Sequence, residues 1–163
     1  MIDEMLEHLA RNWGNWASVV GLVFSFFAFV FSKRASKAAA EARDSVLKRS
    51  LSQEMNQANR TAAAIAQFVG MERGDMALLR AGELLSETSY LIARWESRLA
   101  EQSMTNLRRA RELLLTIQEA LSKKSMADLP SAQKSRLAQS CQQVDLIFSE
   151  EYGTAMKATD KGD

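Results

Sequence analysis

The fold is decided by residues 13–69, which read WGNWASVVGLVFSFFAFVFSKRASKAAAEARDSVLKRSLSQEMNQANRTAAAIAQFV. The first 20 of these residues carry no charge, and the whole stretch contains no proline. A helix of that length spans about 30 Å, the thickness of the hydrocarbon core of a membrane. Because no glycine follows Gly21 within the stretch, we expect one long helix. It begins as a transmembrane helix over residues 13–32 and continues into water as a stalk over residues 33–69.

Small residues recur along the first half of this helix at alternating spacings of four and three. That spacing keeps them on one helix face. Small residues let helix backbones approach closely in lipid. Two interpretations remain open: the face packs against a sister copy, or it lines a pore at the axis of a closed homo-oligomer of four copies. We call it the small-residue face, and its membrane members are Ser18, Gly21, Ser25, Ala28 and Ser32.

Heavier apolar residues continue the pattern from about Val46–Leu47 onward. They follow a four-three repeat, which predicts packing against other helices at a shallow angle. A lone helix of this length is unstable in water, so its partners must come from this chain or from copies of it. Gly70 is expected to end the helix in the left-handed conformation. We call this set the heptad face: Leu47, Leu51, Met55, Ala58, Ala62, Ile65 and Val69.

The charges on either side of the span predict its orientation. Three carboxylates and one arginine precede it, and a cluster of cations follows it. The positive-inside rule then places the N-terminus outside and residues 33–163 in the cytoplasm as a helical domain. Residues 1–12 are predicted to form a short amphipathic segment, either a polar lead-in or a helix lying in the membrane interface. The cations are Lys33, Arg34, Lys37, Arg43, Lys48 and Arg49.

Apolar periodicity after Gly70 predicts three further helices, at about residues 75–101, 105–124 and 131–152. Asp75 is expected to cap the first of them, and the polar run Glu101–Thr105 to turn the chain. A single helix over residues 75–124 remains an alternative. The tail after residue 152 is expected to fray. The predicted core lines are Leu78, Ala81, Leu85, Ile92, Trp95 and Leu99, with Leu84 and Leu91 widening the face; Leu107, Ala110, Leu114, Ile117 and Leu121; and Leu137, Cys141, Val144, Ile147 and Phe148.

Composition narrows both the fold class and the chemistry. Glycine and proline are scarce, with 7 and 1 residues, and no run alternates apolar and polar residues with β-branched enrichment, so we expect an all-α helical bundle. The net charge of +1 argues against a uniformly basic nucleic-acid coat. One histidine and one cysteine cannot build a zinc site. No nucleophile or phosphate-loop motif occurs, so we expect no catalytic residue, metal or cofactor.

Arginines gather where the first two of the three shorter helices are expected to meet. One interpretation is that they lie on solvated helix faces, balanced by nearby glutamates. The other is an electropositive site that grips the phosphates of a nucleotide or an oligonucleotide. Trp95 falls on the apolar line and is therefore expected in the core. The candidate ligand-binding residues are Arg94, Arg98, Arg108, Arg109 and Arg111.

The span Trp13–Ser32, its exit sequence SKRASKAAAEARDSVLKR (residues 32–49) and the helical hairpins that follow resemble the small membrane effectors of bacterial anti-phage systems. Among these effectors, the chain resembles the membrane effector of the Hailong system. The resemblance is architectural and covers the full length. It implies a homotetrameric channel in the bacterial inner membrane. It also implies that a single-stranded DNA oligomer, made by a partner nucleotidyltransferase, holds the channel shut.

The main expectation is therefore a membrane effector that forms a homo-oligomeric ion-conducting pore in anti-phage defence. A nucleotide or oligonucleotide bound to the cytoplasmic helical domain would control that pore. The alternative is a membrane-anchored helical scaffold that recruits a protein partner and conducts no ions. An enzyme is not expected.

Overall fold

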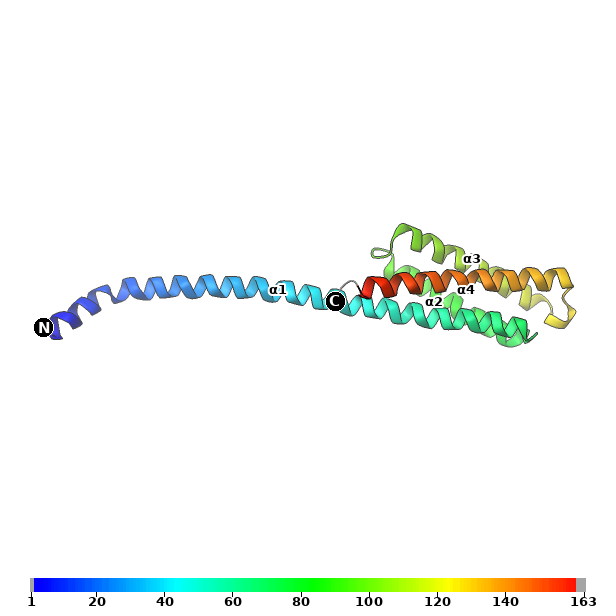
Figure 1. Ribbon diagram of the computed structural model, residues 1–163, viewed down its shortest axis with the longest axis horizontal. Helices are drawn as coiled ribbons and strands as arrows, with labels where there is room; N and C mark the ends of the chain where they lie inside the picture. Colours follow the sequence, from blue (N-terminus) through cyan, green and yellow to red (C-terminus); the bar gives the residue numbers. More distant parts are fainter. Residues whose placement is uncertain (1, 161–163) are drawn as a thin grey trace. The chain divides into compact units, whose positions relative to one another are not determined.

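The computed structural model describes the backbone of residues 2–160 and the side chains of Ser18 and of residues 20–160 (Figure 1). Within that part of the chain every regular element is helical, which confirms the all-α prediction. The elements are α1 (Ile2–Gly70), α2 (Gly74–Trp95), α3 (Glu101–Lys123), the short 3-10 helix η1 (Met126–Asp128) and α4 (Ser131–Asp160).

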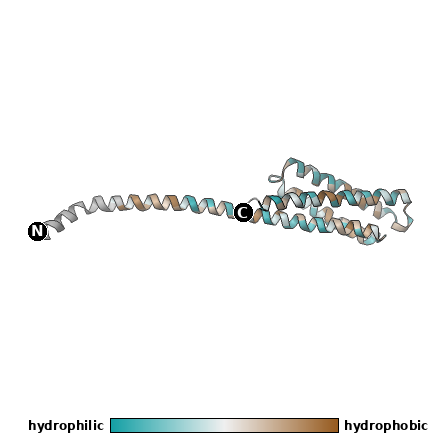
Figure 2. Ribbon diagram, in the orientation of Figure 1, coloured by the Kyte–Doolittle hydropathy of each residue, from teal (hydrophilic) through white to brown (hydrophobic). Residues whose placement is uncertain are grey.

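The chain divides into two compact units, Met1–Val46 and Leu47–Asp163, so that α1 belongs to both. In the first unit, every described side chain from Ser18 to Val46 is exposed except that of Val30, which is half-buried. Figure 2 shows hydrophobic residues following one another along this part of α1. The division falls at the position where the small-residue face gives way to the heptad face.

The second unit is a four-helix bundle made by the last part of α1 with α2, α3 and α4 (Figure 1). From Met55 to Val69, every member of the heptad face is buried, and Leu47 and Leu51 pack at the edge of the same core. Alanines at two consecutive heptad positions, Ala58 and Ala62, leave room for the neighbouring side chains to interdigitate. The prediction that this face packs against other helices is confirmed.

The remaining helices complete one continuous core. The predicted apolar lines of α3 and α4 are buried throughout. On α2 the predicted residues Ala81, Leu84, Leu91 and Trp95 are buried, whereas Leu78, Leu85 and Ile92 pack only at the edge of the core. Thr88 tolerates full burial because its hydroxyl donates to the carbonyl of Leu84 at 2.6 Å.

The turn between α1 and α2 differs from the prediction. Glu72, and not Gly70, adopts the left-handed conformation, with φ of 57°. The amide of Arg73 donates to the carbonyl of Phe68 at 2.9 Å and that of Glu72 to the carbonyl of Val69 at 3.1 Å, the pattern of a Schellman cap. The Glu72 carboxylate also accepts from Lys134 of α4 at 2.8 Å, which ties the turn to the bundle.

Three other helix boundaries differ from the prediction. Asp75 lies inside the first turn of α2, and Arg73 occupies the N-cap without a side-chain cap bond. The chain reverses between Trp95 and Glu101, so this region forms two helices as predicted and not the single-helix alternative, and the polar run Glu101–Thr105 opens α3 instead of forming the turn. Finally, α4 runs on to Asp160, because Glu151 and Ala155 are buried and extend its packed face beyond the expected end.

In the described part of the chain, no helix has an apolar stretch long enough to cross a membrane. The side chains of residues 13–17 and Val19, which belong to the predicted span, lie outside the described residues. The same holds for the side chains of the amphipathic segment predicted over residues 1–12.

Candidate functional site

The predicted pore-lining or packing residues all lie on α1 in the first unit, and all are exposed. A methyl group added at Gly21 would meet no atom within 4 Å. Ser25, Ala28 and Ser32 are likewise exposed among the residues that the structure describes. The small-residue face is therefore open to a lipid, to a sister helix or to water.

Large apolar residues occupy the rest of the circumference of α1. At 3.6 residues per turn, the five small residues fall within one sector and the bulky ones fill the remainder. Eight of the bulky side chains are 47–73 % exposed. A helix that is apolar on nearly all sides is stable only when something apolar surrounds it. The exposed residues are Val20, Leu22, Val23, Phe24, Phe26, Phe27, Phe29 and Phe31.

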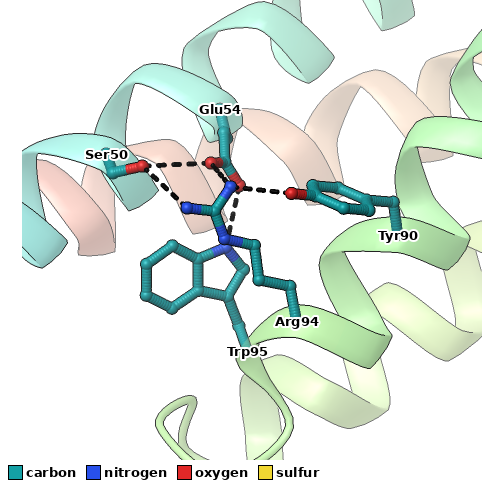
Figure 3. A network of polar contacts seen from close by, with 5 residues as sticks. All are labelled: Ser50, Glu54, Tyr90, Arg94 and Trp95. Atoms are coloured by element: carbon teal, nitrogen blue, oxygen red, sulfur yellow. Dashed lines mark hydrogen bonds and ion pairs between the residues drawn. The ribbon is translucent and has the colours of Figure 1, made fainter.

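Arg94, the first of the candidate phosphate ligands, belongs to a polar network between α1 and α2 (Figure 3). Its Nη1 donates to Glu54 Oε1 at 2.6 Å and to the Tyr90 hydroxyl at 2.8 Å, while its guanidinium lies 5.1 Å from the centre of the Trp95 ring. Trp95 Nε1 donates to Glu54 Oε2 at 2.8 Å, and Ser50 Oγ donates to Glu54 Oε1 at 3.1 Å. Both oxygens of one carboxylate are thus engaged.

This network has a clear structural role. Trp95 is 2 % exposed, so its indole N–H needs an acceptor inside the protein, and Glu54 supplies it. The charge of Glu54 is in turn balanced by Arg94, whose side chain is 40 % exposed. Charge-assisted hydrogen bonds of this kind are the stronger ones in proteins. Arg94 therefore joins α1 to α2, and a phosphate would have to compete with Glu54 for it.

The other candidate arginines lie near the same end of the α2–α3 hairpin. Arg98 belongs to the connection between α2 and α3 and has an interaction within the protein. Arg108 lies 3.8 Å from Glu96 of that connection, a contact between two exposed side chains. Arg109 and Arg111 are exposed and make no hydrogen bond or ion pair with any residue that the structure describes. These two offer the most accessible guanidinium groups of the set.

Glu54 is the important residue that the sequence interpretation missed. It is the only carboxylate between Ser45 and Val69, and it lies next to the heptad position Met55. A lone acidic residue beside an apolar face, together with an Arg–Trp pair on another predicted helix, was the available signal. Pairing them required knowledge of the register of α1 against α2.

A second carboxylate, Glu87 of α2, faces a groove that it shares with Gln57 and Thr61 of α1. Its Oε2 is buried and has no hydrogen-bond partner in the described part of the chain. Burial, and secondarily the charge of Glu83, raises the pKa of this carboxyl above its ordinary value. Ionisation of Glu87 in the folded protein is therefore disfavoured.

Among the residues with described side chains, no cluster of three or more histidine, cysteine, aspartate or glutamate residues could hold a metal ion. The single histidine, His8, lies outside them. Comparisons with protein-family profiles, with characterised proteins and with solved structures found no significant match for this chain.

Proposed function

We propose that the protein is a single-pass membrane effector of bacterial anti-phage defence that assembles into a homo-oligomeric, tetrameric ion-conducting pore. Its α1 contributes the pore, and its helical bundle is a cytoplasmic sensor for a nucleotide or oligonucleotide. The observation that carries the proposal is the uncovered apolar surface of α1 between Val20 and Phe31. The resemblance to anti-phage effectors supports the biological setting.

The exposed side chains support insertion into a membrane. Moving one of them from water into an apolar environment is worth about 1.5–3 kcal/mol, so eight of them strongly favour lipid or protein cover. The described apolar stretch is shorter than the roughly 20 residues that a span needs. The proposed span therefore also includes Trp13–Ala17, whose lack of charge is read from the sequence. The cations that begin at Lys33 favour a cytoplasmic bundle.

The separation of small from bulky residues supports a ring of helices. Helices pack about 8–10 Å apart, so four of them enclose only a narrow axis, which small side chains leave open. With Ser18, Ser25 and Ser32 turned toward that axis, every second turn would present hydroxyls to a passing ion, while the phenylalanines would meet lipid. A single helix cannot enclose a channel, so the pore requires copies of the chain.

Ion flux through liposomes tests the pore. The purified protein should conduct, and Ser25→Leu should reduce conduction at least tenfold because leucine would obstruct the axis. Phe27→Leu, which changes the opposite side of α1, is the matched control and should conduct like the unchanged protein. A protein that passes no ions in any ligand condition, or a Ser25→Leu variant that conducts normally, would disprove the pore.

The accessible cations at the α2–α3 end support the sensor. Arg109 and Arg111 are exposed and available to phosphates, and Arg108 precedes them on α3. Co-purified nucleic acid should raise the ratio of absorbance at 260 and 280 nm. Replacing Arg109 and Arg111 together by glutamine should lower that ratio and weaken oligonucleotide binding. Protein that carries no nucleotide and ignores added oligonucleotides would refute the sensor and leave the pore untouched.

A scaffold without a pore is the second candidate. Bulky apolar side chains are also exposed on the bundle, and such residues can form part of a protein-binding surface. In addition, Glu54 already engages Arg94, one of the candidate phosphate ligands. Capture of the same protein partner in cells by the unchanged chain and by Ser25→Leu, with no ion flux from either, would favour this function. The exposed residues are Leu79, Tyr90, Leu115, Leu146 and Met156.

A further inference from the structure

A cavity of about 300 Å³ opens between the second half of α3 and the first half of α4. Its apolar wall is aliphatic and includes the buried residues Ile117, Leu129 and Leu137. Leu129, which follows η1, helps to line it. The volume is at the lower end of the range of about 300–1,000 Å³ that is usual for small-molecule sites. The cavity lies toward the far end of α3 from the candidate arginines Arg108, Arg109 and Arg111.

The polar part of the lining has one sign of charge. Lys123, Lys124 and Arg136 contribute to it, and none of the lining residues is acidic. Lys123 is compensated from outside the cavity, because its ammonium donates to Glu119 at 2.5 Å. Lys124 and Arg136 are exposed and have no hydrogen bond or ion pair with any residue in the described part of the chain. Two uncompensated cations therefore stand beside an aliphatic wall.

This combination selects the chemistry of a ligand. An anionic head group would neutralise Lys124 and Arg136, and the arginine fork suits a carboxylate or a phosphate. The lining contains no aromatic side chain on which a nucleobase could stack. An aliphatic body would instead replace water along the side chains of Ile117, Leu129 and Leu137. Each methylene that enters should increase affinity by up to about fourfold.

We propose that this cavity binds a small, freely diffusing amphiphilic anion: a single aliphatic chain bearing a carboxylate or phosphate. The chain lies against Ile117, Leu129 and Leu137, and the head group binds Lys124 and Arg136. Such a ligand contacts both α3 and α4. It would be a second ligand of the bundle, in addition to the proposed oligonucleotide. The site is separate from the proposed oligonucleotide sensor, so its failure would leave that function unaffected.

Calorimetric titration of the full chain in lipid nanodiscs tests the proposal, with decanoate and decyl phosphate as probes. Both should bind with one site per chain, and octanoate should bind more weakly than decanoate. Decanol, which has the same chain without the charge, should bind at least tenfold more weakly than decanoate. Equal affinity for decanol and decanoate, or no saturable binding of either anion, would overturn the proposal.

Two matched arginine variants locate the head group. Arg136→Gln should weaken decanoate binding at least tenfold, as expected for losing a charged hydrogen-bond donor. Arg60→Gln makes the same change of charge at an exposed position on α1 and should leave the affinity for decanoate unchanged. Both positions are exposed, so the fold should persist, and a melting curve checks this. Equal effects of the two variants would indicate nonspecific attraction and reject the site.

Two outcomes of the titration would show that decanoate is not the kind of ligand that the cavity binds. Tighter binding of adenosine monophosphate than of decanoate would overturn the aliphatic assignment. Equal binding of decanoate to nanodiscs with and without the protein would trace the signal to the lipid and would also overturn it. Retention of the decanoate affinity in both neutral and anionic nanodiscs would support a cavity that takes its ligand from solution.

Discussion

The two parts of α1 follow the same four-three spacing but have opposite environments. From Met55 to Val69, every heptad-face residue is buried among α2, α3 and α4, with exposed fractions of 5 % or less. From Ser18 to Ser32, the small-residue face is exposed, and so are the phenylalanines around it. Periodicity therefore identifies a face that packs, but it does not identify the partner.

Side-chain size explains part of the difference. On the heptad face, the large side chains of Met55, Ile65 and Val69 lie on the face itself and are buried in the core of the second unit. In the first unit the bulky residues lie outside the small-residue face, and no described residue covers them. Lipid, or other copies of the chain, must therefore cover these bulky residues. The predictions below test this contrast in order of decreasing effect.

Thiol reactivity should separate the two regions most strongly. Cys141 is 1 % exposed, and burial raises the pKa of its thiol to about 12 from 9.0. Because the thiolate is the reactive form, Cys141 should react about a thousandfold more slowly than an ordinary thiol at pH 8. In a Cys141→Ala background, Ala38→Cys should react at the ordinary rate. Colorimetric thiol titration measures both, and rapid labelling of native Cys141 would contradict the buried core.

Truncation of the core should have the next largest effect. Leu114 is fully buried, so Leu114→Ala should lower the free energy of unfolding by about 2–5 kcal/mol. Leu115→Ala, one residue along and 46 % exposed, should change it by less than about 0.5 kcal/mol. Urea denaturation followed by circular dichroism gives both values. Similar losses from the two variants would mean that α3 faces the bundle differently.

Removal of Glu54 should weaken the attachment of α1 to α2. Glu54→Ala leaves the buried Trp95 N–H without an acceptor and should lower the free energy of unfolding by about 1–3 kcal/mol. Glu41→Ala removes a carboxylate from the first unit, where its partner Lys37 lies 3.7 Å away and both side chains are largely exposed. Glu41→Ala should lower the free energy of unfolding by about 0.5 kcal/mol or less. A Glu54→Ala variant with an unchanged free energy of unfolding would contradict the network in Figure 3.

Replacement of Glu87 should have the smallest effect on the stability of the bundle, and this effect should depend on pH. Because its folded pKa is raised, the folded protein holds the proton more tightly than the unfolded chain does. Its contribution to stability is therefore greatest below pH 4.5 and is lost as the pH rises through the folded pKa. At pH 7, Glu87→Gln should stabilise the bundle by up to about 0.5 kcal/mol. The gain should vanish at low pH.

Glu112→Gln is the control for that measurement, because Glu112 is exposed on α3. Melting temperatures of the three proteins across the pH range give the comparison. A gain for Glu87→Gln that persists unchanged at low pH would show that ionisation of this carboxyl is not its cause.

Much of the bundle could be predicted from the sequence. Scarce glycine and proline, and periodicities near 3.6, predicted an all-α chain and the buried lines of α3 and α4. The local turns could not be predicted as well. Gly70 was the obvious left-handed residue, yet Glu72 takes that conformation, because the cap bonds of the α1 end and the ion pair with Lys134 together stabilise it there. Lys134 and Glu72 are 62 residues apart in the sequence.

The candidate site shows the same limit. The sequence by itself determined which residues of α1 form a small-residue face and which form a heptad face, because residue size and spacing are local properties of one helix. Only the tertiary structure decided that Arg94 engages Glu54 and that Glu87 Oε2 has no hydrogen-bond partner in the described part of the chain. It also placed Lys124 and Arg136 in the lining of one aliphatic cavity. Those arrangements depend on the register of one helix against another, which many long-range contacts set together and no single stretch of sequence encodes.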